Sequence, residues 1–359
     1  MTGILIEPDW LVTSGTDEPR AGHSVRVLGG RIDGLGPAAE MRAAHPEDRV
    51  VPAGGRVLAP GFVNAHTHMY GVLAHGIPMT GAPTDFWSFL EDFWWPRVED
   101  ALDVEMITAA TRWACAEMML SGTTAFYDIE EAPFALPGVL GAQARAVEEM
   151  GMRGILSFEA TERAGIDIAR LGLAENVAAI EAAATGQSPL VDAMMCFHTT
   201  FTCSPSYVTE AFELAAGLGV LTHCHVNEGV HEPRWALENL GRRTLEHYRH
   251  LGVTGDRMLA SQVVQLSESE RRILAEDGVR CVHMPLSNCE VGGGIAPIPE
   301  LLAEGVTMGL GSDGYVNDFY EVMRGAFMMH KGRLCDPTVM DARTVFDLAT
   351  RGGAEALDR

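Results

Sequence analysis

The sequence predicts an α/β protein, in which a (β/α)8 barrel of the TIM type follows a small β-rich subdomain. The chain has 359 residues, of which 47% are hydrophobic, enough for one large barrel with an appendage. From residue 59 onward, short apolar runs alternate with longer helix-like stretches, and eight such runs are present. We therefore expect a β subdomain over residues 1–58 and a barrel over residues 59–359.

The N-terminal segment contains short apolar stretches separated by glycine-rich turns. Gly3–Ile6, Trp10–Thr13 and His23–Leu28 are predicted strands, and Gly29-Gly30 marks a turn after the third of them. Such a subdomain is expected to need partner strands from a C-terminal segment. None is present in this sequence, so we expect the natural protein to continue beyond Arg359.

The barrel prediction depends on eight strands with helices between them. The strands are expected at Gly61–Ala65, Thr123–Tyr127, Arg153–Phe158, Val191–Phe197, Val220–His225, Met258–Val264, Arg280–His283 and Thr307–Leu310. Helices are expected at Val104–Leu120, Leu136–Met150, Leu173–Ala184, Tyr207–Gly217, Thr244–His250, Glu268–Glu276, Pro299–Ala303 and Asp341–Ala349. In such barrels, reactive side chains stand at the C-terminal ends of the strands.

Charge and hydropathy exclude several classes of partner. With 26 basic and 49 acidic residues, the formal net charge is −23, which disfavours binding to nucleic acid. No apolar run approaches the roughly 20 residues that span a bilayer, and the N-terminus lacks the basic start and long apolar stretch of a signal peptide. We expect a cytoplasmic protein that acts on a small molecule without contact to a membrane.

Histidine and acidic residues gather at the ends of three predicted strands. His66 and His68 follow the first strand and, two residues apart, point the same way. His225 closes the fifth strand, and Asp313 lies just past the eighth. Three imidazoles and a carboxylate suit one Zn²⁺ or Fe²⁺ with an open position for water, whose pKa such an ion lowers to about 7. Glu228 is then available as a general acid and base.

Four motifs resemble those of the amidohydrolase superfamily. In chain order they are Pro60-Gly61-Phe62-Val63-Asn64-Ala65-His66-Thr67-His68, His225-x-x-Glu228, His283-x-Pro285-x-Ser287-Asn288 and Gly309-x-Gly311-Ser312-Asp313-Gly314. Within the superfamily they are similar to the branch of cytosine and guanine deaminases, S-adenosylhomocysteine deaminases and triazine hydrolases. A closer likeness, to a group of aminohydrolases associated with selenium metabolism, rests on Phe93-Trp94-Trp95-Pro96-Arg97, Phe158-Glu159-Ala160-Thr161-Glu162-Arg163-Ala164-Gly165 and Ala174-Glu175-Asn176.

The resemblance implies a role for each motif residue. His66, His68 and His225 would bind the metal, and Asp313 would complete the site and take a proton from the attacking water. Glu228 would protonate a ring nitrogen of the substrate. His283 would lie near the pocket, as a catalytic or as a structural residue.

Gln262 is a departure from the family pattern, since these deaminases usually carry a histidine after the sixth strand. Glutamine donates and accepts hydrogen bonds but carries no proton between partners. Three alternatives stay open: Gln262 orients the water, or the reaction is not ordinary deamination, or activity has been lost.

A single metal ion is favoured by the lysine count. Binuclear relatives bridge two metals with a carbamylated lysine from the fourth strand. The only lysine here is Lys331, beyond the eighth strand. His198, which comes after the fourth strand, is either a lining residue or a structural one.

Candidate substrate contacts come from three places. The segment 85–95 holds three of the six tryptophans, and Trp87 is expected to stack on a flat heterocycle. The alternative is that this segment forms an amphipathic helix that packs on a neighbouring subunit. Glu159 and Arg163 come after the third strand and are placed to contact a polar substrate, as is Asn288 after the seventh.

The function expected from these features is metal-dependent deamination of an amino-substituted heterocycle of the purine, pyrimidine, pterin or triazine type. One alternative is hydrolysis of another C–N, C–halogen or C–S bond, with Gln262 marking the change. A second is a non-catalytic relative. We expect one divalent ion, Zn²⁺ before Fe²⁺, and, by analogy with the family, a homodimer or higher homo-oligomer.

Overall fold

The computed structural model describes residues 2–79, 81–186, 188–314 and 316–359, and it divides into two compact units. The first comprises Met1–Gly61 and Ala342–Asp347, and the second comprises Phe62–Asp341 and Leu348–Arg359. Among the described residues, no helix combines the length and the apolar character that crossing a bilayer requires.

The first unit is a five-stranded sheet. Its elements are β1 (Ile4–Leu11), β2 (Arg20–Ala21), β3 (His23–Leu28), β4 (Arg31–Pro37), α1 (Ala38–Ala44), β5 (Arg49–Leu58) and α14 (Ala342–Asp347). β1 pairs antiparallel with β2 and β3 and parallel with β5. The C-terminal helix α14, which was predicted to belong to the barrel, is part of this unit instead. It is held there by Asp347, whose Oδ1 accepts a hydrogen bond of 2.8 Å from the Gly15 amide.

The predicted strands of this unit are corrected in two ways. Gly3–Ile6 and Trp10–Thr13 merge into the single strand β1, whose register shifts between Pro8 and Trp10 because proline cannot donate to the ladder. β4 and β5 were not predicted. Neither strand has a buried residue, so no apolar alternation marks them.

The second unit contains strands at all eight positions predicted for the barrel. They are β6 (Phe62–Thr67), β7 (Thr123–Glu130), β8 (Arg153–Phe158), β9 (Val191–Ala193) with β10 (Met195–Cys196), β11 (Thr222–Val226), β12 (Met258–Gln262), β13 (Arg280–His283) and β14 (Met308–Leu310). They pair in parallel in two sheets, β6-β7-β8-β9 and β10-β11-β12-β13-β14.

The two sheets adjoin at both of their edges. β9 and β10 are separated by Met194 alone, whose amide donates to Leu156 O at 3.2 Å. At the other junction, Thr67 bridges Asp313 in parallel, and the Ser312 amide donates to His66 O at 2.9 Å. The eight strand positions therefore form a circuit, with the ends of β6 and β14 side by side.

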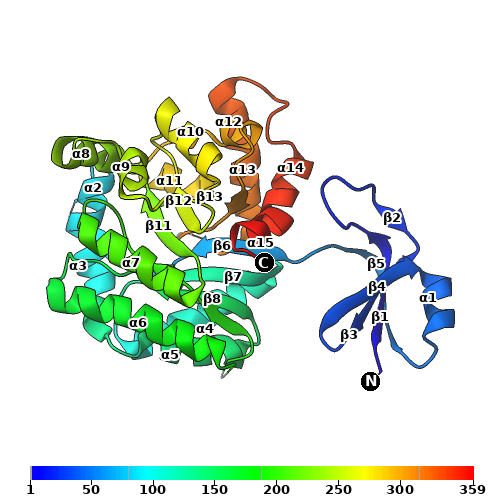
Figure 1. The fold of residues 1–359 in the computed structure, drawn as a ribbon. Coiled ribbons are helices and arrows are strands. Elements are labelled where there is room, and N and C mark those ends of the chain that lie inside the picture. The colour runs from blue at the N-terminus through cyan, green and yellow to red at the C-terminus, as the bar shows by residue number, and fades with distance from the viewer. Residues whose placement is uncertain (1, 80, 187, 315) are drawn as a thin grey trace. The chain divides into compact units, whose positions relative to one another are not determined.

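Helices surround this circuit (Figure 1). They are α2 (Phe86–Phe89), α3 (Trp95–Arg97), α4 (Val104–Leu120), α5 (Val139–Met150), α6 (Ile166–Ala184), α7 (Pro205–Leu218), α8 (His231–Leu240), α9 (Thr244–Leu251), α10 (Glu268–Asp277), α11 (Pro285–Glu290), α12 (Ile298–Ala303), α13 (Phe319–Leu334) and α15 (Gly353–Ala356). Short 3₁₀ and π turns complete the unit: η1 (Met69–Ala74), η2 (Leu90–Trp94), η3 (Glu99–Ala101), η4 (Pro133–Ala135) and η5 (Leu348–Gly352).

The predicted helices of this unit are confirmed, some with shifted ends. Side-chain caps fix where some of these helices begin. At the start of α4, the Asp103 side chain accepts a hydrogen bond of 2.8 Å from the Met106 amide. α8, α11, α13 and α15 were missed, and the segment of α2 and α3 was expected to be helical only as an alternative. In α13 the glycine at 325 lowers helix propensity but is needed, because a Cβ there would lie 2.8 Å from Leu286 Cδ2.

Candidate metal centre and active site

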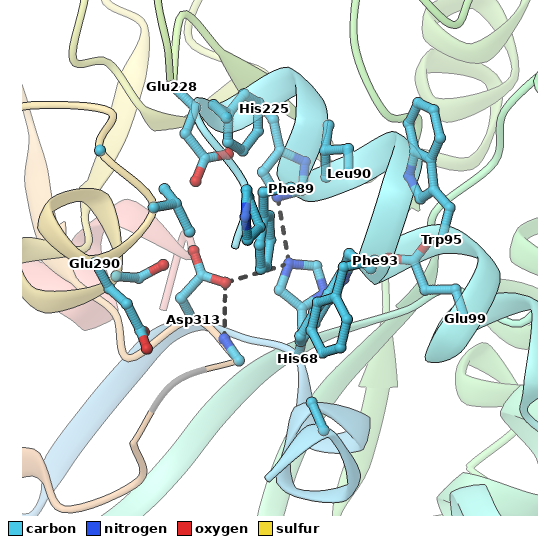
Figure 2. Close-up of a pocket in the computed structure, with 18 of the residues that line it drawn as sticks. His68, Phe89, Leu90, Phe93, Trp95, Glu99, His225, Glu228, Glu290 and Asp313 are labelled. Atoms are coloured by element: carbon cyan, nitrogen blue, oxygen red, sulfur yellow. Dashed lines mark hydrogen bonds and ion pairs between the residues drawn. The ribbon is translucent and has the colours of Figure 1, made fainter. Parts of the chain in front are cut away.

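A cavity of about 640 Å³ opens where the strands of the second unit end (Figure 2). The ends of β6, β8, β11, β12 and β14 contribute His68, Glu159, His225, Gln262 and Asp313 to its lining. This is the location that the alternation of strands and helices predicted.

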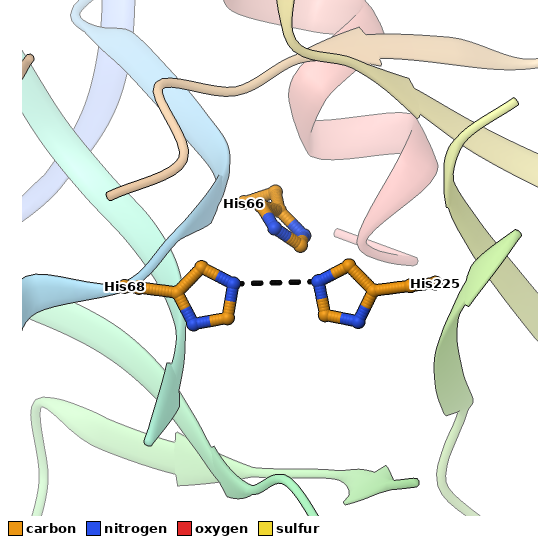
Figure 3. Close-up of side chains that lie close together, drawn as sticks. All are labelled: His66, His68 and His225. Carbon is orange, nitrogen blue, oxygen red and sulfur yellow. Dashed lines mark hydrogen bonds between the residues drawn. The ribbon is translucent and has the colours of Figure 1, made fainter. Parts of the chain in front are cut away.

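Three buried imidazoles meet beside the cavity (Figure 3). His66 and His68 project from the same face of β6, and His225 projects from β11. Each offers a ligand nitrogen, and these nitrogens lie within 4.8 Å of one another. Asp313 joins them, with Oδ2 3.9 Å from His66 Nε2 and Oδ1 3.8 Å from His68 Nε2.

The protonation of these imidazoles is determined by their neighbours. His68 Nδ1 lies 2.8 Å from the Ile129 carbonyl oxygen, which only accepts, so Nδ1 carries the hydrogen and Nε2 keeps its lone pair. His225 Nδ1 lies 2.9 Å from Glu159 Oε1, which favours the same tautomer. Burial lowers the pKa of all three imidazoles, that of His68 to about 4, so they are neutral near pH 7.

This donor set fits one divalent ion. His68 Nε2 and His225 Nε2 are 3.3 Å apart, and with both hydrogens on Nδ1 neither can donate to the other. Two zinc–nitrogen bonds of about 2.0–2.1 Å at a tetrahedral angle place their nitrogens roughly 3.3–3.4 Å apart. Both ring nitrogens of His66 are buried without a hydrogen-bond partner among the described residues. Three such nitrogens and the Asp313 carboxylate can hold a metal ion, and Glu159, His198 and His225 form a second group of possible ligands that shares His225.

Asp313 is held as an anion. Burial alone raises the pKa of Asp313, but nearby imidazoles and hydrogen bonds outweigh it, so the pKa lies below its usual value. Gln262 Nε2 donates to Oδ2 at 2.7 Å, and the Gly314 amide donates to Oδ1 at 2.7 Å. Asp313 and Gln262 both have left-handed backbones, with φ of 62° and 74°, a strain that is commonly kept at functional sites.

Gln262 thus contacts the carboxylate rather than standing apart from the site. Its Oε1 is buried and has no hydrogen-bond partner in the described part of the chain. The side chain lines the cavity. The Nε2 group of Gln262 can hold Asp313 in place while its Oε1 atom accepts a hydrogen bond.

Glu228 lines the cavity from the loop after β11. Burial, reinforced by the charges of Asp313 and Glu159, raises the pKa of Glu228 well above its usual value, which favours the protonated form of the side chain. The loop is fixed by Asn227, whose Nδ2 donates to Glu270 Oε1 at 2.9 Å. A carboxylic acid in a rigid buried loop is suited to donate a proton.

Two of the predicted substrate residues are not part of the cavity lining. Trp87 stacks on His231 with ring centroids 4.3 Å apart and is not among the residues that line the cavity. Arg163 forms ion pairs with Glu99, Asp100 and Glu131 and also lies outside the lining. Both side chains find stronger partners in neighbouring segments than the cavity offers.

The remaining predicted residues are divided between the cavity and the protein interior. Glu159 lines the cavity but lies against His225, which makes it a positioning partner of that imidazole. His283 is buried with its Nε2 3.0 Å from His330 Nε2 on α13, and Asn288 is buried in α11. Neither His283 nor Asn288 belongs to the cavity lining.

His198 lines the cavity, which supports the first of the two alternatives predicted for it. Other lining residues were missed by the sequence analysis, among them Glu99 and Glu290. Phe89 and Phe93 form an aromatic wall from α2 and η2. The aromatic segment was predicted to cover the substrate or to form an amphipathic helix, but the sequence did not tell which of its rings face the cavity, because that depends on the positions of its helical turns.

Comparisons with known proteins agree with this geometry. The model of the amidohydrolase family matches residues 57–359. The 5-methylthioadenosine/S-adenosylhomocysteine deaminase of Syntrophobacter fumaroxidans is 34% identical over 343 residues, covering 93% of this chain and 75% of the relative. The 5′-deoxyadenosine deaminase of Methanothermobacter thermautotrophicus is 33% identical over 314 residues, covering 86% of this chain and 71% of the relative.

A solved structure extends the likeness to the fold. The crystal structure of an adenosine deaminase from Xanthomonas campestris with bound zinc superposes with a TM-score of 0.84 and 26% identity. The match covers 99% of this chain and 80% of that one. The chain therefore belongs to the amidohydrolase family, as its motifs predicted.

Proposed function

We propose that this protein is a metal-dependent deaminase of adenosine-type nucleosides. The observation that carries the proposal is the convergence of three buried imidazoles, the carboxylate of Asp313 and the side chain of Glu228 at one cavity. The relatives named above act, by their names, on adenosine derivatives, which favours the purine type among the heterocycles that the sequence left open. We also infer that the circuit of strands is a (β/α)8 barrel with the cavity at its C-terminal mouth.

His66, His68, His225 and Asp313 would hold one ion, and the donor set suits zinc. Such an ion, when bound, lowers the pKa of water to about 7 and so supplies the nucleophile near neutral pH. Lys331 Nζ donates to the carbonyl oxygens of Pro337 and Met340, at 3.1 and 3.2 Å, so it is held elsewhere in the fold. This supports one ion rather than two.

The side chains divide the proton transfers between them. Glu228 would give its proton to the ring nitrogen next to the carbon that bears the amino group. Asp313 would accept a proton from the attacking water, while the amide of Gln262 keeps its carboxylate in place. Asp313 would then pass this proton to the departing nitrogen, so that the C–N bond breaks and ammonia leaves. The new hydroxyl group would lose its proton to Glu228, which restores the acid and leaves an oxo group on the ring.

The test combines metal content with a panel of heterocycles. Protein purified without added metal should hold about one zinc or iron per chain. Ammonia should be released from adenosine derivatives and not from pterins, pyrimidines or triazines. Ammonia from one of the other ring types alone would replace the proposed substrate class, and ammonia from none of them would contradict deamination.

Gln262 keeps a second candidate function open. A glutamine that is hydrogen bonded to Asp313 holds a carboxylate but relays no proton, which suits hydrolysis of a C–N, C–halogen or C–S bond with a better leaving group. Release of chloride or of a thiol from substituted heterocycles, without ammonia from amino-substituted ones, would favour this candidate. A protein that stays free of metal after reconstitution would instead be a non-catalytic relative.

A further inference from the structure

We propose that Glu232 is a positioning residue for the proton donor Glu228, because its buried carboxylate holds the backbone turn that brings Glu228 to the cavity. The inference rests on the proposed function, in which Glu228 gives the proton, and adds a residue that lies outside the four family motifs. Glu232 is in the first turn of α8, four residues after Glu228, and is not among the described residues that line the cavity. It therefore acts through another residue and not on the substrate.

The turn depends on one residue with a left-handed backbone. Along an extended strand, side chains three residues apart project to opposite faces, yet His225 and Glu228 both line the cavity. Asn227 lies between them and has a φ of 54°, which breaks the alternation just after β11 ends at Val226. Asparagine tolerates this conformation better than most residues, but it persists only where neighbouring groups hold it. The position of Glu228 therefore depends on what holds Asn227.

Glu232 holds this turn at the backbone. Its Oε2 accepts a hydrogen bond of 2.5 Å from the Asn227 amide. Its Oε1 accepts hydrogen bonds from the Thr200 amide at 3.2 Å and from the Thr200 hydroxyl at 2.8 Å. All three residues are buried, so water competes little for these bonds. One carboxylate thus joins the turn before Glu228 to the loop after β10.

The donors around Glu232 match a carboxylate and no other side chain of the same shape. A backbone N–H group faces each of its two oxygens, and an N–H group cannot accept a hydrogen bond. In either orientation, Glu232→Gln would therefore place an amide NH2 against one of these N–H groups. Burial raises the pKa of Glu232 to about 7, against the opposing effect of the hydrogen bonds from Asn227 and Thr200. Above that pH the carboxylate predominates.

Other contacts hold the remaining groups of Asn227. Its carbonyl oxygen accepts a hydrogen bond from the Gln265 amide at 2.8 Å, and its Nδ2 donates to Glu270 Oε1 at 2.9 Å. Glu270 is in turn held by Arg243, whose Nε donates to Oε2 at 2.7 Å. These contacts stay in place when Glu232 is changed. A Glu232 variant therefore tests the position of the turn in a loop that is still held on its other sides.

Kinetics of Glu232→Gln at about pH 8.5, where wild-type Glu232 is a carboxylate, test this role. We expect kcat for ammonia release from 5′-methylthioadenosine to fall by about 10- to 100-fold, because a displacement of about 1 Å has an effect of that size on a positioned group. KM should stay within about threefold and the metal content should not change, because neither depends on the aim of Glu228. A kcat within about twofold of the wild-type value would overturn the inference.

Glu175→Gln is the matched control. Glu175 is buried on α6, and its carboxylate also accepts hydrogen bonds from two backbone amides, those of Gly138 at 2.8 Å and Leu140 at 2.9 Å. Both variants should lower the temperature of thermal unfolding, but Glu175→Gln should leave kcat within about twofold. An equal loss of kcat in the two variants would mean that lowered stability, and not the position of Glu228, causes it.

A double variant separates positioning of Glu228 from a general loosening of the site. Once Glu228→Gln has removed the proton donor, Glu232→Gln should have little further effect, so the kcat of the double variant should lie within about threefold of that of Glu228→Gln. A further fall of about 10-fold or more would show that Glu232 acts independently of Glu228, which contradicts the inference.

Hydrogen exchange tests the contact without reference to the reaction. The Asn227 amide should exchange at least about 10-fold faster in Glu232→Gln than in the wild type, and at an unchanged rate in Glu175→Gln. Unchanged exchange in Glu232→Gln would overturn the inference even for an active enzyme. A wild-type protein that releases no ammonia, together with faster exchange in this variant, would sink the deamination and keep the role of Glu232 in holding the turn.

Discussion

The two sides of the cavity are built in different ways. The metal side consists of residues at strand ends, where His66, His68 and His225 are almost fully buried and the backbone ladder fixes their direction. The opposite wall consists of short helical turns, α2 and η2, with part of its aromatic surface exposed. The difference suggests that the strand ends determine the chemistry and that the wall determines which substrate is admitted.

On the metal side of the cavity, removal of a metal ligand is expected to have the largest effect on activity. His68→Ala takes one nitrogen from the donor set, so we expect loss of bound ion and a fall in kcat of at least about 10⁴-fold. Elemental analysis and ammonia release measure the two effects. His250→Ala, at an exposed position on α9, is the control and should keep both. Full activity in the His68 variant would remove it from the site.

Loss of the proton donor should rank second. Glu228→Gln keeps the shape of the side chain but cannot protonate a ring nitrogen, so kcat should fall by about 10²–10⁴-fold while metal content stays unchanged. Steady-state kinetics with metal analysis on the same sample provide the measurement. Glu238→Gln, exposed on α8, is the matched control. Near-normal turnover would assign the proton transfer to another group.

The partner of His225 provides a finer test of the strand side. Glu159→Gln replaces the carboxyl group that lies 2.9 Å from His225 Nδ1 with an amide, and metal affinity should fall by about 10- to 100-fold. Competition with a chelator measures this affinity. A lowered kcat with unchanged affinity would instead make Glu159 a substrate contact.

The aromatic wall should respond through KM. Phe89→Ala removes one ring contact, worth about 0.5–1.5 kcal/mol, so KM should rise by roughly 2- to 12-fold with kcat little changed. Phe134→Ala is the control, since that ring is exposed and outside the lining. A fall in kcat without a change in KM would mean that the wall also shapes the chemical step.

The same division explains how much could be predicted from the sequence. All eight predicted strand positions hold strands, and His66, His68 and His225 meet beside Asp313 as expected, because strand periodicity and parallel register leave little choice of direction.

Side chains in loops and helices escaped this reasoning. Trp87 and Arg163 were placed in the correct segments, yet Trp87 packs on His231 and Arg163 on three carboxylates. Their direction depends on local helical turns and on partners distant in the sequence, such as Glu99. The wall residues Phe89 and Phe93 were missed for the same reason.

The central claim is that one ion, held by three histidines and an aspartate, supports deamination of an adenosine derivative. Its most direct test is the titration of metal-depleted protein with Zn²⁺ while ammonia release from 5′-methylthioadenosine is monitored. The account predicts activity that rises linearly and stops rising at one Zn²⁺ per chain. A break at two Zn²⁺ per chain, or no ammonia at full occupancy, would contradict it.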